Sequence, residues 1–174
     1  MAEVETVEMP EPLGIYAGEL LKRAKEYLDA FRTLSGGPDL AKYPYPNYFL
    51  AVHATELLLK SFLVANGTTK KELSGHELRH DLVKLWERSA KLGLPIVGLL
   101  EPFVRTLAEM NSKYDFRYPS GYNLHVPLLS DCNAVITALH DTVEPIVSSI
   151  AWSAQLQWWD DTNGLRGKKI QWSD

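Results

Sequence analysis

The stretch that most constrains the fold of this chain is residues 47–65, which is apolar on nearly every side of a helix. Its hydrophobic runs, 49–52, 57–59 and 62–64, together surround the axis when successive residues advance by about 100°. A helix of this kind must be covered by other elements over most of its surface. The stretch therefore predicts a central, buried helix, which an Asn-Gly pair terminates.

Four further segments have apolar residues at helical spacing, and no segment has the alternating pattern of a convincing core strand. These predicted helices span 13–34, 81–92, 101–110 and 130–150. Together with the central helix they predict an all-α, single-domain five-helix bundle. After residue 151, the short runs 156–158 and 169–172 flank an Asp-Asp-Thr-Asn-Gly sequence, which indicates a small C-terminal hairpin.

The charged residues are unevenly distributed and divide the chain into parts. Residues 1–12 contain four Glu and neither Lys nor Arg, which predicts an acidic, disordered leader. The net charge of −4 belongs to this leader, because residues 13–174 contain 18 basic and 18 acidic side chains. The bundle is assigned to 13–150, and 151–174 is a Trp-rich C-terminal tail. Residues 60–117 hold 10 Lys and Arg against 7 Asp and Glu, so any nucleic acid is expected there.

The chain of 174 residues contains one cysteine, Cys132, which excludes an internal disulfide framework and a cysteine-rich zinc cluster. We expect Cys132 to be an inert, buried thiol. No apolar run reaches about 18 residues, and the N-terminus lacks the basic and apolar regions of a secretory signal. A cytoplasmic protein without a membrane segment is therefore expected.

Residues 76–80 read His-Glu-Leu-Arg-His, a literal match to the H-E-x-x-H pattern of zinc hydrolases. On a helix, His76 and His80 would share one face and bind zinc, and Glu77 would activate the bound water. The residues before the motif lack a helical pattern, so the motif is predicted to straddle the start of a helix near Asp81. A zinc-dependent hydrolase is the third functional alternative, and no resident metal or cofactor is expected.

Several segments together resemble the HEPN family of helical-bundle proteins. The central stretch Asn47–Lys60 looks like the family's signature helix, and Gly75–Leu78 and His80–Trp86 are similar to later family segments. The stretch Lys113–Pro119 is similar to a segment found in many of these proteins. The resemblance covers residues 13–150. It implies a compact α-helical bundle, often a symmetric dimer, in a prokaryotic-type cytoplasm.

The resemblance also implies a function. Many HEPN proteins are metal-independent ribonucleases of toxin–antitoxin, phage-defence or RNA-processing systems, and others are inactive or act as binding modules beside nucleotidyltransferases. The ribonucleases carry an Arg followed, after a short spacer, by a His. The nearest such pair here is Arg117 and His125, separated by seven residues, which is longer than the family's spacer. In such a site the His moves a proton and the Arg stabilises charge on the phosphate while the ribose 2′-hydroxyl attacks.

The segment that contains this pair is long and aromatic, and such loops are often functional in compact domains. In the functional interpretation, Lys113 holds a phosphate, and Tyr114 and Tyr118 stack on bases. A structural interpretation stays open, in which Arg117 pairs with an acid such as Glu56 and Tyr118 fills a groove.

Polar residues form one stripe on the central helix, where His53, Glu56 and Lys60 lie within about 60° of one another. They would line a polar pocket that His80 also reaches, or they would make structural contacts such as an i,i+4 pair between Glu56 and Lys60. Glu56, Lys60 and His80 complete the predicted substrate-binding residues.

The leading hypothesis is an RNA- or nucleotide-binding protein of a toxin–antitoxin or defence system, a metal-independent ribonuclease if it is an enzyme. Its expected partners are a second copy of the chain, RNA or a nucleotide, and a nucleotidyltransferase-type antitoxin. The alternative is a non-catalytic homodimeric module that binds a protein through its dimer or its Trp-rich tail, since tryptophan is enriched at interfaces.

Overall fold

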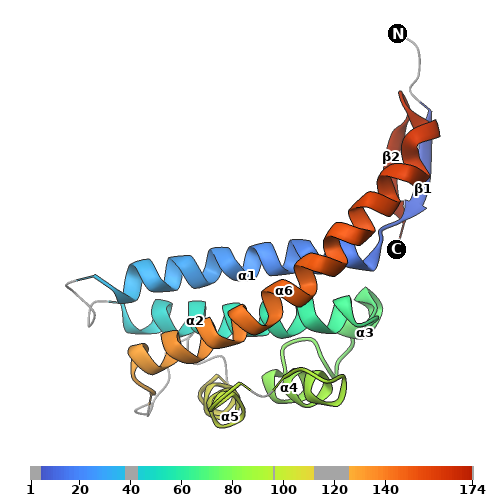
Figure 1. The fold of residues 1–174 in the computed structure, drawn as a ribbon. Helices are drawn as coiled ribbons and strands as arrows, with labels where there is room; N and C mark the ends of the chain where they lie inside the picture. The colour runs from blue at the N-terminus through green and yellow to red at the C-terminus, as the bar shows by residue number, and fades with distance from the viewer. Residues whose placement is uncertain (1–4, 38–42, 96, 112–125, 174) are drawn as a thin grey trace.

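The computed structural model describes residues 5–37, 43–95, 97–111 and 126–173. Its elements, in chain order, are β1 (Thr6–Pro10), α1 (Leu13–Ser35), α2 (Pro44–Ala65), α3 (Lys70–Ser74), α4 (Leu82–Lys91), α5 (Leu100–Met110), α6 (Leu129–Thr162), the 3₁₀ helix η2 (Asn163–Leu165) and β2 (Lys169–Ser173). The long helices α1, α2 and α6 pack against one another, and α4 and α5 lie on the side of α2 away from α1 (Figure 1). The predicted all-α class is confirmed.

The central position predicted for the apolar helix is occupied by α2, which contacts α1, α4 and α6. Its residues Ala51, Leu58, Leu59 and Leu63 are fully buried. Among the described helices, α2 alone is long and apolar enough to cross a membrane, and 72% of its most apolar window is buried inside the fold. The bundle core therefore accounts for its apolar character.

The helices α1, α2, α4 and α5 begin and end within three residues of their predicted bounds. The short helix α3 was not predicted, although its capping box is readable in the sequence: Thr69 Oγ1 accepts from Glu72 N at 3.2 Å, and Thr69 N donates to Glu72 Oε2 at 2.9 Å. Helix α6 ends at Thr162 and not near residue 150, because residues 151–162 contain no Gly or Pro to terminate it.

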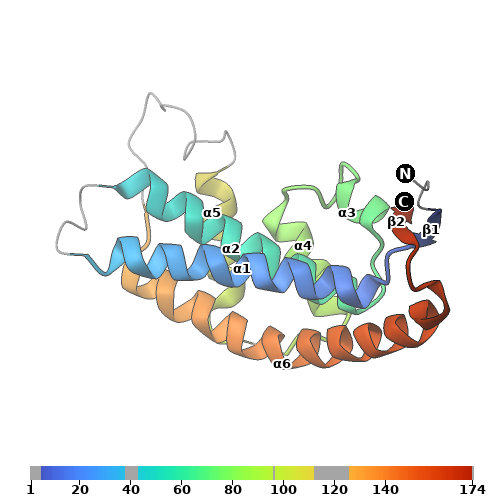
Figure 2. The ribbon, with the colours of Figure 1, turned by 90° about the horizontal axis from the view of Figure 1, so that it is seen from above.

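A close crossing joins the start of α1 to α6. A Cβ atom added to Gly14 would lie 2.6 Å from Ala154 Cβ, and one added to Gly18 would lie 2.9 Å from Ala151 Cβ. Only the absence of side chains at these two glycines allows the helices to approach so closely. Every fully buried residue of α6 lies at or before Val147. From this crossing on, α6 projects from the bundle, and we call its residues 152–162 the α6 arm (Figures 1 and 2).

The tip of the α6 arm carries a two-stranded sheet in which β1 and β2 pair in parallel, with Val7 opposite Ile170 and Met9 opposite Trp172. The predicted C-terminal hairpin is therefore wrong: residues 156–158 are part of α6, and β2 pairs with a strand from the other end of the chain. The sheet also places an ordered strand in the leader that was predicted to be disordered. Apolar pairs across the two strands and an ion pair between Lys168 and Glu5 at 2.9 Å explain this pairing.

Candidate functional site

The predicted catalytic pair and three predicted substrate-binding residues lie in the segment 112–125, outside the described residues. They are Arg117, His125, Lys113, Tyr114 and Tyr118. The other three predicted site residues, Glu56, Lys60 and His80, are described and lie together. We call these three residues the Glu56 cluster.

The Glu56 cluster is built around a buried carboxylate on the central helix. The Glu56 side chain is 5% exposed, and its Oε1 lies 2.7 Å from Lys60 Nζ and 3.1 Å from His80 Nδ1. Lys60 is 13% exposed and His80 is 43% exposed. The predicted i,i+4 contact between Glu56 and Lys60 is confirmed, while the contact to His80 joins residues 24 positions apart and had no local signal. The cluster thus presents one half-exposed imidazole on a buried acid.

The arrangement of Glu56 and His80 can support proton transfer. When Nδ1 of His80 carries the proton and donates to Glu56, Nε2 of the same ring is an acceptor. A carboxylate that orients a histidine in this way is the usual support for a general base. The Lys60 ammonium, held at 2.7 Å from the same carboxylate, adds a positive charge beside the ring. The Lys60 and Glu56 charges cancel, so the cluster can accept a proton at Nε2 of His80 and is net positive once that ring is protonated.

The same contacts also hold the backbone. Lys60 Nζ donates to the carbonyl oxygen of Arg79 at 2.6 Å, so the helix α2 is tied to the turn that precedes α4. At the end of this turn, the Asp81 side chain accepts from Lys84 N at 3.0 Å and caps α4, as the sequence predicts. The Glu56 cluster thus fixes where His80 lies relative to the bundle.

His53 does not join this cluster, although it was predicted to share its stripe. Its ring packs edge-on against Tyr27 at 4.4 Å and stacks on Phe49 at 5.7 Å between ring centroids. The polar stripe of α2 is therefore divided into an aromatic contact with α1 and a charged contact with the turn before α4.

The H-E-x-x-H match does not form the helix that a zinc site of this kind requires. Residues 76–78 form a turn and residues 79–80 a bend, so the two histidines are not one helical turn apart. His80 instead faces Glu56. Within the described ranges, no group of three His, Cys, Asp or Glu side chains is placed to hold a metal ion. The sequence also predicted that a helix begins near Asp81, and this is confirmed, because Asp81 caps the start of α4.

A second polar site, which the sequence analysis missed, surrounds Arg32 at the end of α1. Its guanidinium donates to Asn133 Oδ1 at 3.2 Å and to Thr137 Oγ1 at 2.7 Å, and its Nη1 lies 3.4 Å from Asp29 Oδ1. It lines an open cavity of about 540 Å³ beside the residues that follow the segment 112–125. The cavity is lined by Arg32, Ser35, Gly36, Tyr48, Val126, Pro127, Leu128, Leu129, Ser130 and Asn133. The spacing of 101 residues between Arg32 and Asn133 explains why no local pattern revealed it.

Two residues near this cavity, Tyr48 and Cys132, have raised pKa values. The Tyr48 phenol donates to the Pro127 carbonyl at 2.7 Å, and burial raises its pKa. Burial also raises the pKa of Cys132, from 9.0 to about 12. Cys132 is fully buried, so the prediction of a buried thiol is confirmed, and the raised pKa makes it a poor nucleophile.

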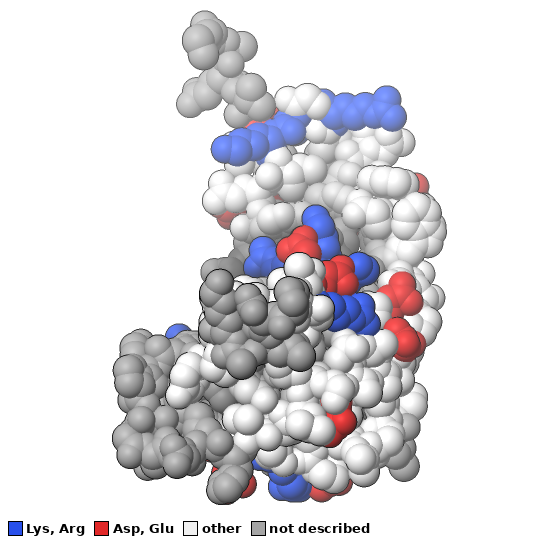
Figure 3. Space-filling model, turned by 90° about the vertical axis from the view of Figure 1, so that its left-hand side faces the viewer, with Lys and Arg blue, Asp and Glu red and all other residues white. Residues whose placement is uncertain are grey.

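The surface charge around these sites is mixed. On the face that Figure 3 shows, the described Lys and Arg side chains of the bundle alternate with Asp and Glu and form no continuous basic surface.

In a comparison with known proteins, no protein-family model, no curated protein and no solved structure matches this chain.

Proposed function

We propose that this protein binds RNA or a nucleotide on the surface that includes His80 and Lys60 of the Glu56 cluster. One observation carries the proposal: a 43%-exposed histidine held on a 5%-exposed carboxylate, with a lysine ammonium on the same acid. A phosphate oxygen is a suitable partner for the exposed imidazole, because a protonated His80 can donate to it while Lys60 offsets the charge of Glu56. The ligand would contact the cluster from the solvent side, since Glu56 itself is buried.

The proposal extends to catalysis through the resemblance to HEPN proteins. In it, Arg117 stabilises the phosphate and His125 moves the proton of the 2′-hydroxyl, without a metal ion. Lys113, Tyr114 and Tyr118 then hold the flanking phosphates and bases. A cytoplasmic toxin–antitoxin or defence system with a nucleotidyltransferase-type antitoxin is part of the same proposal.

The test is RNA cleavage and RNA binding by the pure full-length protein in EDTA. We expect cleavage by the wild type and none by Arg117→Ala or His125→Ala. His80→Ala is expected to weaken binding of a labelled single-stranded RNA at least tenfold. The matched control is His76→Ala, which removes an exposed histidine four residues away in the same turn and should leave binding and cleavage unchanged.

The outcomes separate the hypotheses. A wild type that is inactive in EDTA and regains cleavage with added zinc, together with an inactive His76→Ala in zinc, would favour the zinc hydrolase. Cleavage unchanged in Arg117→Ala and His125→Ala would place the reaction elsewhere. If the wild type neither cleaves nor binds RNA or nucleotides, the proposed function is wrong.

The alternative, a non-catalytic interaction module, is favoured by a different observation. The α6 arm exposes Trp152, Leu156 and Trp159, at 60%, 44% and 55% of their surface. Large side chains of this kind are enriched at protein interfaces and depleted from surfaces that contact only water. This alternative predicts protein binding through the α6 arm with no RNA binding by the Glu56 cluster.

A further inference from the structure

The α6 arm presents a continuous apolar stripe to solvent. Trp152, Leu156 and Trp159 are spaced by four and three residues, so they lie on one face of the helix. The two tryptophan rings contact each other edge to face, with centroids 6.2 Å apart. The opposite side of the arm is already used, because Trp158 packs on Trp172 of β2 at 4.6 Å. The stripe is therefore the face of the arm that the described part of this chain leaves uncovered.

The part of α6 that carries the stripe is uncharged up to its last tryptophan. From Pro145 to Trp159 the helix contains no Asp, Glu, Lys or Arg. Figure 3 shows the same pattern on the surface, where an uncharged region separates the charged residues of the bundle from the Lys and Arg at the tip. A helix surface without charges can meet an identical surface without repulsion between like charges.

The order of residues in the stripe is self-complementary. Read in either direction, it gives Trp, Leu, Trp. When two such helices pack antiparallel about a twofold axis near Leu156, each Trp152 meets Trp159 of the partner subunit and the leucines meet at the centre. An isologous contact of this kind needs the same patch on both partners, which the stripe provides.

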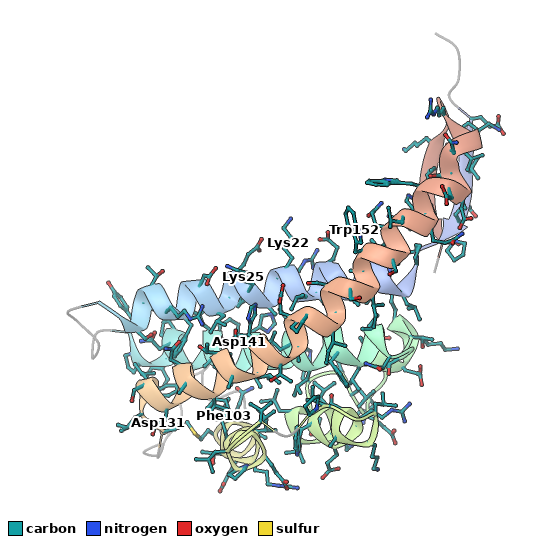
Figure 4. All side chains as sticks on the ribbon, viewed as in Figure 1. Lys22, Lys25, Phe103, Asp131, Asp141 and Trp152 are labelled. Atoms are coloured by element: carbon teal, nitrogen blue, oxygen red, sulfur yellow. The ribbon has the colours of Figure 1, made fainter. Side chains whose placement is uncertain are left out.

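The charges outside the stripe also match this register. In the antiparallel arrangement, Asp160 of the partner subunit lies at the axial level of Ala151, where α6 crosses Gly18 of α1. Lys22 follows Gly18 by one helical turn, and Lys22 and Trp152 point to the same side of the molecule (Figure 4). A cation on α1 thus lies where the carboxylate of the second copy arrives.

We propose that two copies of this chain associate through their α6 arms, packed antiparallel along the stripe Trp152, Leu156 and Trp159. This inference goes beyond the proposed function and does not depend on RNA binding. Because these side chains are already about half buried, the six from two copies would bury roughly 700 Å² of side-chain surface. An area of this size is typical of weak, transient interfaces, so dissociation in the micromolar range or weaker is expected.

The first experiment is sedimentation equilibrium of the full-length protein from 1 to 200 µM, concentrations chosen to span that range. We expect a reversible dimer for the wild type and at least a tenfold weaker dimer for the double variant Trp152→Ala, Trp159→Ala. The control is Leu99→Ala, which removes a 71%-exposed leucine far from the arm and should leave the dimer unchanged. A wild type that stays monomeric, or a double variant that dimerises like the wild type, overturns the proposal.

A second experiment tests the register. Under mild oxidation, Leu156→Cys should form disulfide-linked dimers, since residue 156 lies next to the twofold axis. Ser149→Cys should not, because the two residues 149 would lie roughly 20 Å apart along the paired helices. Efficient crosslinking through residue 149 but not 156 would contradict the antiparallel arrangement.

The expected contact between Lys22 and Asp160 of the partner subunit gives a third test, in which exchanging both charges is the control. Lys22→Glu and Asp160→Lys should each weaken the dimer several-fold, and the double exchange should restore it. Because both residues are exposed, neither change should alter the fold. If the double variant dimerises no better than the single variants, the predicted contact between Lys22 and Asp160 is wrong.

Discussion

The central helix α2 and the α6 arm are both rich in large apolar side chains, but these side chains lie in opposite environments. In α2, Leu58 and Leu59 are fully buried. In the α6 arm, Trp152 and Trp159 are 60% and 55% exposed. The difference lies in position, because α1, α4 and α6 cover α2, whereas the arm starts at the crossing of α1 and α6 and projects away from the bundle. Apolar residues thus build the core in one region and lie exposed on the surface in the other.

The difference between the two regions is tested by truncating one leucine in each. Leu58→Ala should lower the free energy of unfolding by about 3 kcal/mol, because it leaves a cavity in the core. Leu156→Ala should lower it by about 0.5 kcal/mol or less when measured in dilute monomer. Urea unfolding followed by circular dichroism measures both. Equal losses in the two variants would show that the arm is as well packed as the core.

A second prediction concerns the charged part of α2. Glu56→Gln leaves the 13%-exposed Lys60 ammonium without its carboxylate, and we expect a loss of about 3 kcal/mol in the free energy of unfolding. The matched control is Glu101→Gln, which removes an equivalent i,i+4 pair to Arg105 whose side chains are about half exposed. The control should change stability by less than about 0.5 kcal/mol. Similar effects in the two variants would mean that Glu56 is not the buried anchor of the cluster.

A third prediction tests the crossing from which the α6 arm departs. Gly14→Ala places a Cβ atom 2.6 Å from Ala154 Cβ and 3.0 Å from the Ile150 carbonyl oxygen, so the helices must move apart. We expect a loss of about 2 kcal/mol in the free energy of unfolding. Gly164→Ala is the control, because nothing lies within 4 Å of the added atom. If Gly14→Ala is as well tolerated as Gly164→Ala, the close approach of the helices is not needed for stability.

Local patterns in the sequence predicted the elements of the bundle well. The apolar character of 47–65 predicted the central helix, and the i,i+4 spacing predicted the contact between Glu56 and Lys60. The contact between Glu56 and His80 could not be predicted, because it depends on how the turn before α4 folds back on α2. The same holds for the guanidinium of Arg32, which bonds to a helix about 100 residues later.

The ends of the chain show the limit of such patterns most clearly. Residues 169–172 have the composition of a strand, and the nearest apolar run predicted their partner within the tail. The strand pairs instead with β1, because α6 carries the tail back to the beginning of α1, where Val7 and Met9 are available. Strand pairing at this distance is decided by the tertiary path of the helices, which no local pattern encodes.

The smallest expected effect is a pH dependence of stability that comes from the core beneath α6. The Cys132 thiol has a pKa raised from 9.0 to about 12 by burial, so above pH 9 the unfolded state loses its proton while the folded state keeps it. The unfolded state then binds fewer protons, and the free energy of unfolding falls as pH rises from 9 towards 12. At pH 10 the expected loss from this group is about 1 kcal/mol.

Lysine and tyrosine side chains also titrate in this range, so the wild type must be compared with Cys132→Ala. The variant is less stable at neutral pH because it loses a buried side chain, but its stability should decline less steeply between pH 8 and 10. Urea unfolding at several pH values gives both slopes. Parallel curves would mean that Cys132 is not protected in the folded state, and a thiol reagent would then label the native protein. The α6 arm contains no cysteine, so the contribution of a thiol to the pH dependence of stability comes from the buried part of α6.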